Sequence, residues 1–273
     1  MPLFFNFTKP GPGVPEIDDR TTIKIFFDIY FRKFSKFISI NFLTVLCNFP
    51  AIIVAFVLSG NFIFVDNPEM KVLNISIMYV LMGLLVCFPI LTIGPFQAGL
   101  TYILRNYARE EHSFILSDFK EQTIKNFKQG LIVSFIDFLF ICILIIEFKF
   151  YGGKSDFFSS MTIWINIFVF TIYSMMHMYI YQMMITVELT IIQLYKNALI
   201  FTLMKFLKNI LIYIICAAII FALAIYPIIG VIFFIILLPS TIGFIINFHA
   251  YPTIKKFLIE PAKNKEDVEN KEI

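Results

Sequence analysis

One acidic residue, Asp137, lies inside a stretch of sequence where a charge is unfavourable. The residues from Gly130 to Ile146 are otherwise uncharged and mostly apolar. An aspartate at the centre of a membrane helix costs roughly 2.5–3.5 kcal/mol on insertion scales, so its side chain should face the interior of a helix bundle. Two hypotheses remain open: the carboxyl is buried and satisfied by polar neighbours, or it relays protons or a substrate.

A second group of charged side chains lies close together after the second apolar stretch. Arg105 and Arg109 are spaced i, i+4, and Glu110, Glu111 and His112 follow directly. This spacing is typical of a solvated helix face with ion pairs. The alternative is a docking surface for a cytosolic or membrane partner. No nucleophile–base pair accompanies these residues, so we expect no catalytic residues and no enzyme activity.

A run of sulfur and imidazole side chains at Met175, Met176, His177 and Met178 suggests copper, because thioethers and imidazole bind Cu(I). Only residues three or four apart share one face of a helix, as His177 and Tyr181 do. The methionines therefore point in different directions, and we expect a methionine-rich packing seam without a metal. The sequence also contains no motif for nucleotide, dinucleotide or zinc-protease sites, so we expect no cofactor.

The composition indicates that membrane helices hold these side chains. Of the 273 residues 59% are hydrophobic and only 15% are charged, whereas about a quarter of a soluble domain is charged. So few charges cannot cover a surface that faces water, which excludes a soluble enzyme. The absence of a basic stripe on a soluble face excludes a nucleic-acid binder. We therefore predict an all-α, polytopic membrane protein.

Six segments approach or exceed the length of about 20 apolar residues that a membrane span needs. The last uncharged stretch, Asn209–Ile254, is too long for one helix and must fold back, for which Pro227 is the natural break. Pro239 is expected to kink the final span. The predicted spans are Phe37–Gly60, Val72–Ile93, Gly130–Ile146 with an extension toward Tyr151, Met161–Val187, Asn209–Tyr226 and Ile228–Ala250.

The basic residues predict the orientation of the chain. Of the 22 lysines and arginines, 19 lie in the two tails and in the loops after spans two and four. The positive-inside rule therefore places both termini in the cytoplasm. We predict a tail with an interfacial amphipathic helix (1–36), a six-span membrane domain (37–254) and a charged tail (255–273). Within the tail, the amphipathic pattern runs over Thr21–Lys36, and Asp19 is a candidate cap.

The loop after span two is expected to form a cytoplasmic helical hairpin, residues 94–129. Pro95 suits the first turn of a helix, and Gly94 and Gly99 permit close backbone contact. Tight helix packing is one interpretation of this motif, and an anion or headgroup site at the helix N-terminus is the other. Asp118, with Glu121 three residues later, resembles a capping box for the second helix of the hairpin.

Four short segments carry a resemblance to a known family: Lys9–Val14, Ile93–Tyr102, Arg105–His112 and Ser117–Phe119. In these segments the chain resembles the YesL family, bacterial integral membrane proteins that are grouped by a domain of unknown function and found mostly in Gram-positive species. The specific motifs cover about residues 1–129, with a looser match around Lys196–Ala198. The resemblance implies a location in the bacterial cytoplasmic membrane. Because genes of this family often lie beside those of sugar ABC importers, it also implies a role in carbohydrate uptake.

Three functions remain open. The first is a non-enzymatic accessory or regulatory component of ABC-type carbohydrate uptake, which contacts an importer or another membrane protein through the hairpin. The alternative is a small proton- or solute-coupled carrier that uses Asp137, although the sequence gives no inverted repeat and no pair of unwound helices. The third is a structural protein that binds lipid headgroups through its basic tails. In each case the lipid bilayer is a partner and nucleic acid is not.

Overall fold

The computed structural model describes residues 21–62, 71–152, 154 and 156–261, and within these residues the chain is helical and forms no strand. This confirms the predicted all-α class. The helices are α1 (Thr22–Arg32), α2 (Phe34–Cys47), α3 (Phe49–Ser59), η1 (Gly60–Phe62), α4 (Lys71–Cys87), α5 (Gly94–Ala108), α6 (Ile115–Lys125), α7 (Phe127–Tyr151), α8 (Phe157–Met184), α9 (Ile191–Met204), α10 (Phe206–Ala224), α11 (Pro227–Ile236), α12 (Leu238–Ile254) and η3 (Lys255–Ile259).

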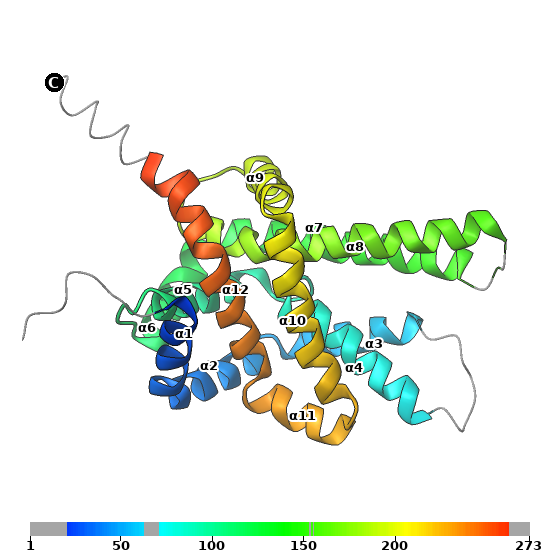
Figure 1. The fold of residues 1–273 in the computed structure, drawn as a ribbon, viewed down its shortest axis with the longest axis horizontal. Coiled ribbons are helices and arrows are strands. Elements are labelled where there is room, and N and C mark those ends of the chain that lie inside the picture. The colour runs from blue at the N-terminus through cyan, green and yellow to red at the C-terminus, as the bar shows by residue number, and fades with distance from the viewer. Residues whose placement is uncertain (1–20, 63–70, 153, 155, 262–273) are drawn as a thin grey trace, which may run out of the picture.

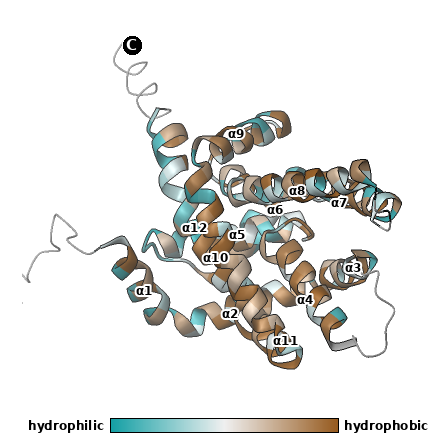
Figure 2. Cartoon of the chain, turned by 45° about the vertical axis from the view of Figure 1, so that its right-hand side comes forward, coloured by the Kyte–Doolittle hydropathy of each residue, from teal (hydrophilic) through white to brown (hydrophobic). Residues whose placement is uncertain are grey.

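Three helices, α7, α8 and α10, are long and apolar enough to cross a membrane, and the number rises to five if each of two bent pairs is one span. These three correspond to the third, fourth and fifth predicted spans, and α7 does extend to Tyr151. Helices α7 and α8 run side by side away from the rest of the bundle, and α10 runs from α9 to α11 at the lower edge of the view (Figure 1). Helices α3, α10 and α11 are hydrophobic over most of their length (Figure 2).

The first and last predicted spans are each broken into two helices. The axes of α2 and α3 differ by 71° at Asn48, and those of α11 and α12 by 62° at Leu237. A proline follows each break, Pro50 in the first turn of α3 and Pro239 in the first turn of α12. Proline cannot continue the preceding helix but fits the first turn of the next one. The expected kink at Pro239 is confirmed, and the first predicted span, Phe37–Gly60, contains a break at Asn48 that the sequence did not predict.

The second predicted span, Val72–Ile93, is also wrong in its extent. Helix α4 ends at Cys87, and residues 88–93 form an irregular turn before α5 begins. Pro89 explains the early end, because proline disfavours a helical conformation of the residue before it and lacks an N–H of its own. With 17 residues, α4 is shorter than the three long spans. The chain therefore turns back into the bundle six residues earlier than expected.

Helix α5 lies at the centre of the molecule, where it contacts α6, α7, α8 and α12 (Figure 1). Most of its residues are buried. A Cβ atom at Gly94 would lie 2.0 Å from the carbonyl oxygen of Gly130 in α7, and one at Gly99 would lie 2.7 Å from that of Phe119 in α6. These backbone contacts agree with the helix-packing interpretation of the glycine motif. Residues 94–129 thus form a helix pair that is packed into the bundle.

The amphipathic helix α1 packs on α12 through its aromatic residues. The Phe26 and Phe244 rings stack with centroids 4.9 Å apart, while Ile23 and Phe31 remain exposed. Thr21 caps α1 by accepting a hydrogen bond from the Lys24 amide, and Asp19 lies outside the described residues. An amphipathic helix with exposed large apolar residues is typical of a membrane interface. Residues 1–20, which precede α1, and the charged tail beyond residue 261 also lie outside the described residues.

Candidate functional site

Asp137 is fully buried in α7 and faces the interior of the bundle, as expected. Two phenols donate hydrogen bonds to its Oδ1 atom, Tyr173 of α8 at 2.5 Å and Tyr195 of α9 at 3.0 Å. The other carboxyl oxygen, Oδ2, has no hydrogen-bond partner among the described residues. A buried carboxyl that is satisfied on one side only is unfavourable for stability alone. This arrangement is therefore a candidate functional site.

His177, on the same face of α8 as Tyr173, places a second titratable group against Asp137. Its Nε2 atom lies 3.1 Å from Asp137 Oδ1, and neither side chain is exposed. On the other side of the ring, Nδ1 lies 3.2 Å from the Tyr173 carbonyl oxygen. A carbonyl oxygen only accepts, so Nδ1 carries a proton. A neutral imidazole then has a bare Nε2, which would face a carboxylate oxygen with lone pairs on both atoms.

A proton on Nε2 or on the carboxyl of Asp137 would remove this repulsion. Without a bound proton, the buried pair carries a net negative charge in a medium of low dielectric, which is unfavourable. The 3.1 Å contact does not have the geometry of a hydrogen bond, and the Asp137–His177 pair is a candidate proton-binding site.

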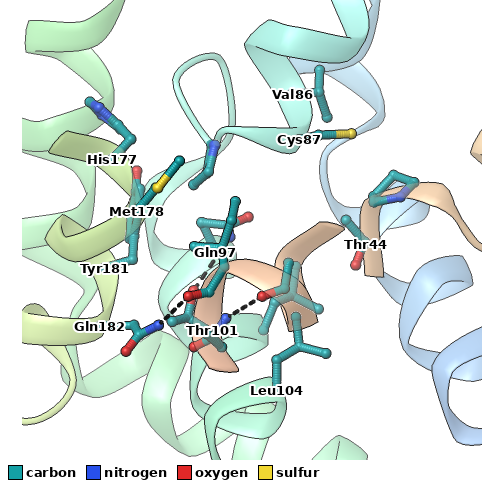
Figure 3. Close-up of a pocket in the computed structure, with 16 residues that line it drawn as sticks. Thr44, Val86, Cys87, Gln97, Thr101, Leu104, His177, Met178, Tyr181 and Gln182 are labelled. Carbon is teal, nitrogen blue, oxygen red and sulfur yellow. Dashed lines mark hydrogen bonds between the residues drawn. The ribbon is translucent and has the colours of Figure 1, made fainter. Parts of the chain in front are cut away.

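A small chamber of about 30 Å³ adjoins His177 at the centre of the molecule (Figure 3). It is lined by Thr44, Val86, Cys87, Pro89, Gln97, Leu100, Thr101, Leu104, His177, Met178, Tyr181, Gln182, Pro239, Gly243, Ile246 and Asn247. All three helix breaks contribute to this wall, through Thr44 near the end of α2, Pro89 between α4 and α5, and Pro239 at the start of α12. The volume accommodates about two water molecules.

Several polar groups in the wall of the chamber are buried without a protein partner. Among the described residues, Tyr181 Oη, Gln182 Oε1 and Asn247 Oδ1 have no hydrogen-bond partner. Leaving such a group unpaired costs about 1–3 kcal/mol, so three around one chamber are not expected in a core that serves packing only. They are the groups that would hydrogen-bond water or a small polar solute.

Two asparagines, one in α2 and one directly after it, form hydrogen bonds with backbone groups at the helix breaks. Asn41 donates from Nδ2 to the carbonyls of Phe234 and Ile235, and its Oδ1 accepts from the Ser240 amide, each at 2.8 Å. Asn48 accepts from the Ile93 amide at 2.8 Å and so binds the start of α5. Both side chains are completely buried. They satisfy backbone groups that the breaks would otherwise leave unpaired.

The N-terminus of α5 is also satisfied from within the protein. The Gly94 amide donates to Ser134 Oγ at 2.7 Å, and Ser134 in turn donates to the Thr92 carbonyl at 2.9 Å. Pro95 has no N–H, and a backbone bond to Ile93 occupies the Gln97 amide at 3.0 Å. The alternative interpretation of this motif, an anion site at the helix N-terminus, therefore lacks the free donors that it requires.

Of the predicted docking residues, Arg105 is not at the surface. Only 7% of it is exposed. Its guanidinium donates to Thr186 Oγ1 at 2.9 Å and to Asn106 Oδ1 at 3.2 Å, which ties α5 to the end of α8. It also lies over the Tyr102 ring, 4.7 Å from the centroid. The expectation that Arg105 contacts a partner is corrected here, because its donors bind groups inside the protein.

The remaining four docking candidates lie in the connection between α5 and α6. Arg109 pairs with Glu111 at 2.6 Å, and Glu110 pairs with Arg32 of α1. Glu110 has a φ of 57°, the left-handed conformation that turns the chain after α5. His112 is exposed and lies edge-on to Phe114. The sequence placed Asp118 as the cap of α6, but it lies inside the first turn and accepts from the Phe114 amide at 2.9 Å.

Comparison with known proteins gives one match. Residues 70–148 match the family described as "Protein of unknown function, DUF624". The matched part runs from the start of α4 into α7, so it contains the glycine motif, the residues around Arg105 and Asp137. His177, Tyr173 and Tyr195 lie beyond it. No curated protein and no solved structure matches the chain.

Proposed function

We propose that the chain is a small membrane carrier in which binding of a proton at Asp137 and His177 is coupled to movement of a small polar solute. The observation that carries the proposal is the 3.1 Å contact between Asp137 Oδ1 and His177 Nε2, two buried groups whose repulsion a bound proton would remove. Intramembrane acidic and histidine residues are typical of proton relays. His177 links this pair to the chamber because it also lies in the chamber wall.

The helix breaks around the chamber support the same function. Carriers bind their substrates near the midplane of the membrane, between discontinuous helices whose half-helices can move separately. In this chain three breaks, after Cys47, Cys87 and Ile236, surround one polar chamber. No pair of unwound helices is apparent in the sequence, because the residues on both sides of the breaks at Asn48 and Leu237 are uncharged and mostly apolar.

The size of the chamber indicates how the cycle would proceed. At about 30 Å³ it holds water only, so a solute enters when the half-helices move apart. Loss of the proton leaves a buried negative charge and two repelling lone pairs at Asp137 and His177, which destabilises the closed conformation. Proton release therefore favours opening, and proton binding favours the closed conformation.

Uptake by reconstituted protein tests this function. Proteoliposomes would be offered labelled monosaccharides, disaccharides, polyols and amino acids, with and without an inward proton gradient. We expect the gradient to stimulate uptake of one of these classes and Asp137→Asn to abolish that stimulation. Asp156→Asn is the matched control, since Asp156 caps α8 outside the bundle. Uptake by the Asp137→Asn protein at the wild-type rate and with the wild-type gradient dependence would exclude Asp137 from the mechanism.

The second candidate function is that of an accessory component of ABC-type carbohydrate uptake. The connection between α5 and α6 supports it. Arg109 and His112 are exposed there, and His112 lines the same pocket as Lys33 and Lys36 of the N-terminal helices. The proposal rests on the resemblance to the YesL family of Gram-positive bacteria and on cytoplasmic termini in the bacterial cytoplasmic membrane.

Purification from native membranes in mild detergent, after growth on a complex glycan, tests the accessory function. Stoichiometric recovery of an importer permease or ATPase is expected, with reduced recovery for Arg109→Ala. An Arg109→Ala protein that recovers the importer as well as wild type contradicts docking at this surface. Recovery of the chain alone, as a discrete oligomer, would eliminate the accessory function altogether.

A further inference from the structure

A long groove separates α1 from α10 and α12, on the side of the molecule away from α7 and α8. Its volume is about 1020 Å³. The walls are apolar along most of their length, and Phe26 of α1 meets Phe248 of α12 edge-on with ring centroids 5.4 Å apart. Its lining contains no acidic residue.

Three lysines lie together at one end of this groove. Lys205 and Lys208 are at the start of α10, and Lys256 follows the end of α12. Helices α10 and α12 are antiparallel in this region, so these two helix ends lie at the same end of the molecule (Figure 1). Among the described residues none of the three lysines forms an ion pair with a carboxylate.

The groove becomes apolar with distance from the lysines. Along α10 its wall consists of Ile212, Ile215 and Ile219, which follow Lys208 on one face. From Lys208 to Ile219 the helix rises about 16 Å. One leaflet of a bilayer contributes about half of the roughly 30 Å hydrocarbon core. The length of the groove along α10 thus matches the thickness of one leaflet, and the lysines lie at the level of the lipid headgroups.

We propose that this groove binds an anionic phospholipid, with its phosphate at Lys205, Lys208 and Lys256 and an acyl chain along α10. Each juxtamembrane lysine strengthens binding of an anionic lipid roughly fivefold, and the apolar walls exclude a free phosphate as the complete ligand. The predicted orientation of the chain places these lysines at the cytoplasmic leaflet. The proposal does not depend on a transport activity, because no residue of the Asp137 site lines the groove.

The single tryptophan of the chain makes a direct test possible. Trp164 lies on α8, 71% exposed and outside the groove. In a Trp164→Phe background, Phe248→Trp places a fluorophore in the groove. Its quenching is measured in phosphatidylcholine vesicles that contain a small fraction of brominated phosphatidylglycerol or of brominated phosphatidylcholine with the same acyl chains. We expect phosphatidylglycerol to quench at a concentration at least tenfold lower.

The controls separate a lipid site from general attraction to charge. Trp164 of the wild-type protein should be quenched equally by the two lipids. Replacing Lys205, Lys208 and Lys256 together by glutamine should remove the preference at position 248. The same replacement at three exposed lysines elsewhere should leave it unchanged; these are Lys120, Lys125 and Lys128.

Three results would overturn the proposal. Equal quenching by the two lipids at position 248 would show no anionic site. Weak quenching by both lipids would show that protein fills the groove, either residues 1–20 or a second copy of the chain. A preference that survives the Lys205, Lys208 and Lys256 replacement would place the site elsewhere. If that variant does not fold, native mass spectrometry of the wild-type protein is the deciding measurement. The proposal then requires that the protein retain one phosphatidylglycerol molecule in preference to phosphatidylcholine.

Discussion

The backbones of Gly94 and Gly130 are so close that neither position accommodates a side chain. A Cβ atom at Gly94 would lie 2.0 Å from the Gly130 carbonyl oxygen, and one at Gly130 would lie 2.6 Å from the Pro95 nitrogen. This contact fixes the start of α5 against α7, about two helical turns before Asp137. It therefore sets the position of α5 relative to the candidate proton site.

Replacement of Gly94 by alanine should destabilise the protein, because the new methyl group meets backbone atoms that cannot rotate away. We expect a loss of about 3 kcal/mol or more, at the upper end of the cost of overpacking. Gly60→Ala is the matched control, since its Cβ would meet only Met78 at an ordinary 3.4 Å. Unfolding in detergent measures both variants. A Gly94→Ala protein as stable as Gly60→Ala would contradict the close contact.

The asparagines at the helix breaks give a second prediction. Asn41→Ala removes three hydrogen bonds and leaves the carbonyls of Phe234 and Ile235 and the Ser240 amide unpaired. The expected loss is about 2–4 kcal/mol, since each unpaired buried group is costly. Ser39→Ala, on the exposed side of α2, should change stability by less than about 0.5 kcal/mol. Thermal unfolding of the three proteins decides, and equal midpoints would refute the role of Asn41.

The contact at Gly94 and the hydrogen bonds of Asn41 show which features can be predicted from the sequence alone. The spans over α7, α8 and α10 follow from uninterrupted apolar residues, and the glycine motif already suggested close packing. Pro239 indicated a bend near Leu237, but the break at Asn48 was not predicted, because a break in an apolar stretch depends on distant groups that satisfy its backbone. Asn41 acts on residues about two hundred positions later in the chain, and no local pattern reveals that pairing.

The candidate site could likewise be predicted only in part, because most of its side chains come from distant parts of the chain. Asp137 is visible in the sequence because a charge interrupts an apolar helix. Its partners Tyr173, His177 and Tyr195 come from two other helices, and only the i, i+4 spacing of Tyr173, His177 and Tyr181 offered a local signal. Arg105 was expected at the surface because arginine is rarely buried, but the end of α8 supplies the acceptors that make burial possible.

Tyr107 should make the protein sensitive to alkaline pH. Burial, with a smaller contribution from Asp118, raises the pKa of its hydroxyl to about 12, whereas an unfolded tyrosine titrates near 10. The folded state holds this proton more tightly, so the contribution of Tyr107 to stability is complete below pH 10 and is lost as the pH rises toward 12. Near pH 11 and above, the wild-type protein should lose on the order of 1–2 kcal/mol that Tyr107→Phe does not lose.

The phenylalanine replacement is a clean test of this pH effect. It retains the ring that lies under Lys33 Nζ, 4.1 Å from the centroid, and removes a hydroxyl that has no partner among the described residues. At pH 8 the variant should therefore equal or exceed the wild type in stability. Thermal unfolding at pH 8 and at pH 11 provides the comparison. Parallel losses in the two proteins would assign the alkaline sensitivity to other groups.

The proton at Asp137 and His177 can be observed without knowledge of the solute. Infrared spectra should contain a band from the protonated pair, either of a carboxylic acid or of an imidazolium. Asp137→Asn should abolish that band, whereas His177→Gln should shift a carboxylic-acid band and abolish an imidazolium band. Asp156→Asn, at the exposed cap of α8, should leave it unchanged.

The same pair should be coupled in stability. In a double-mutant cycle of Asp137→Asn and His177→Gln, the second replacement is expected to cost less once the first has been made, with a coupling of about 1–3 kcal/mol. The reason is that either single replacement leaves one buried polar group facing an unmatched neighbour, while the double replacement removes both members of the proton-binding pair. Strict additivity of the two losses, together with an unchanged infrared band in Asp137→Asn, would mean that no proton is shared between them and that the carrier hypothesis has lost its central support.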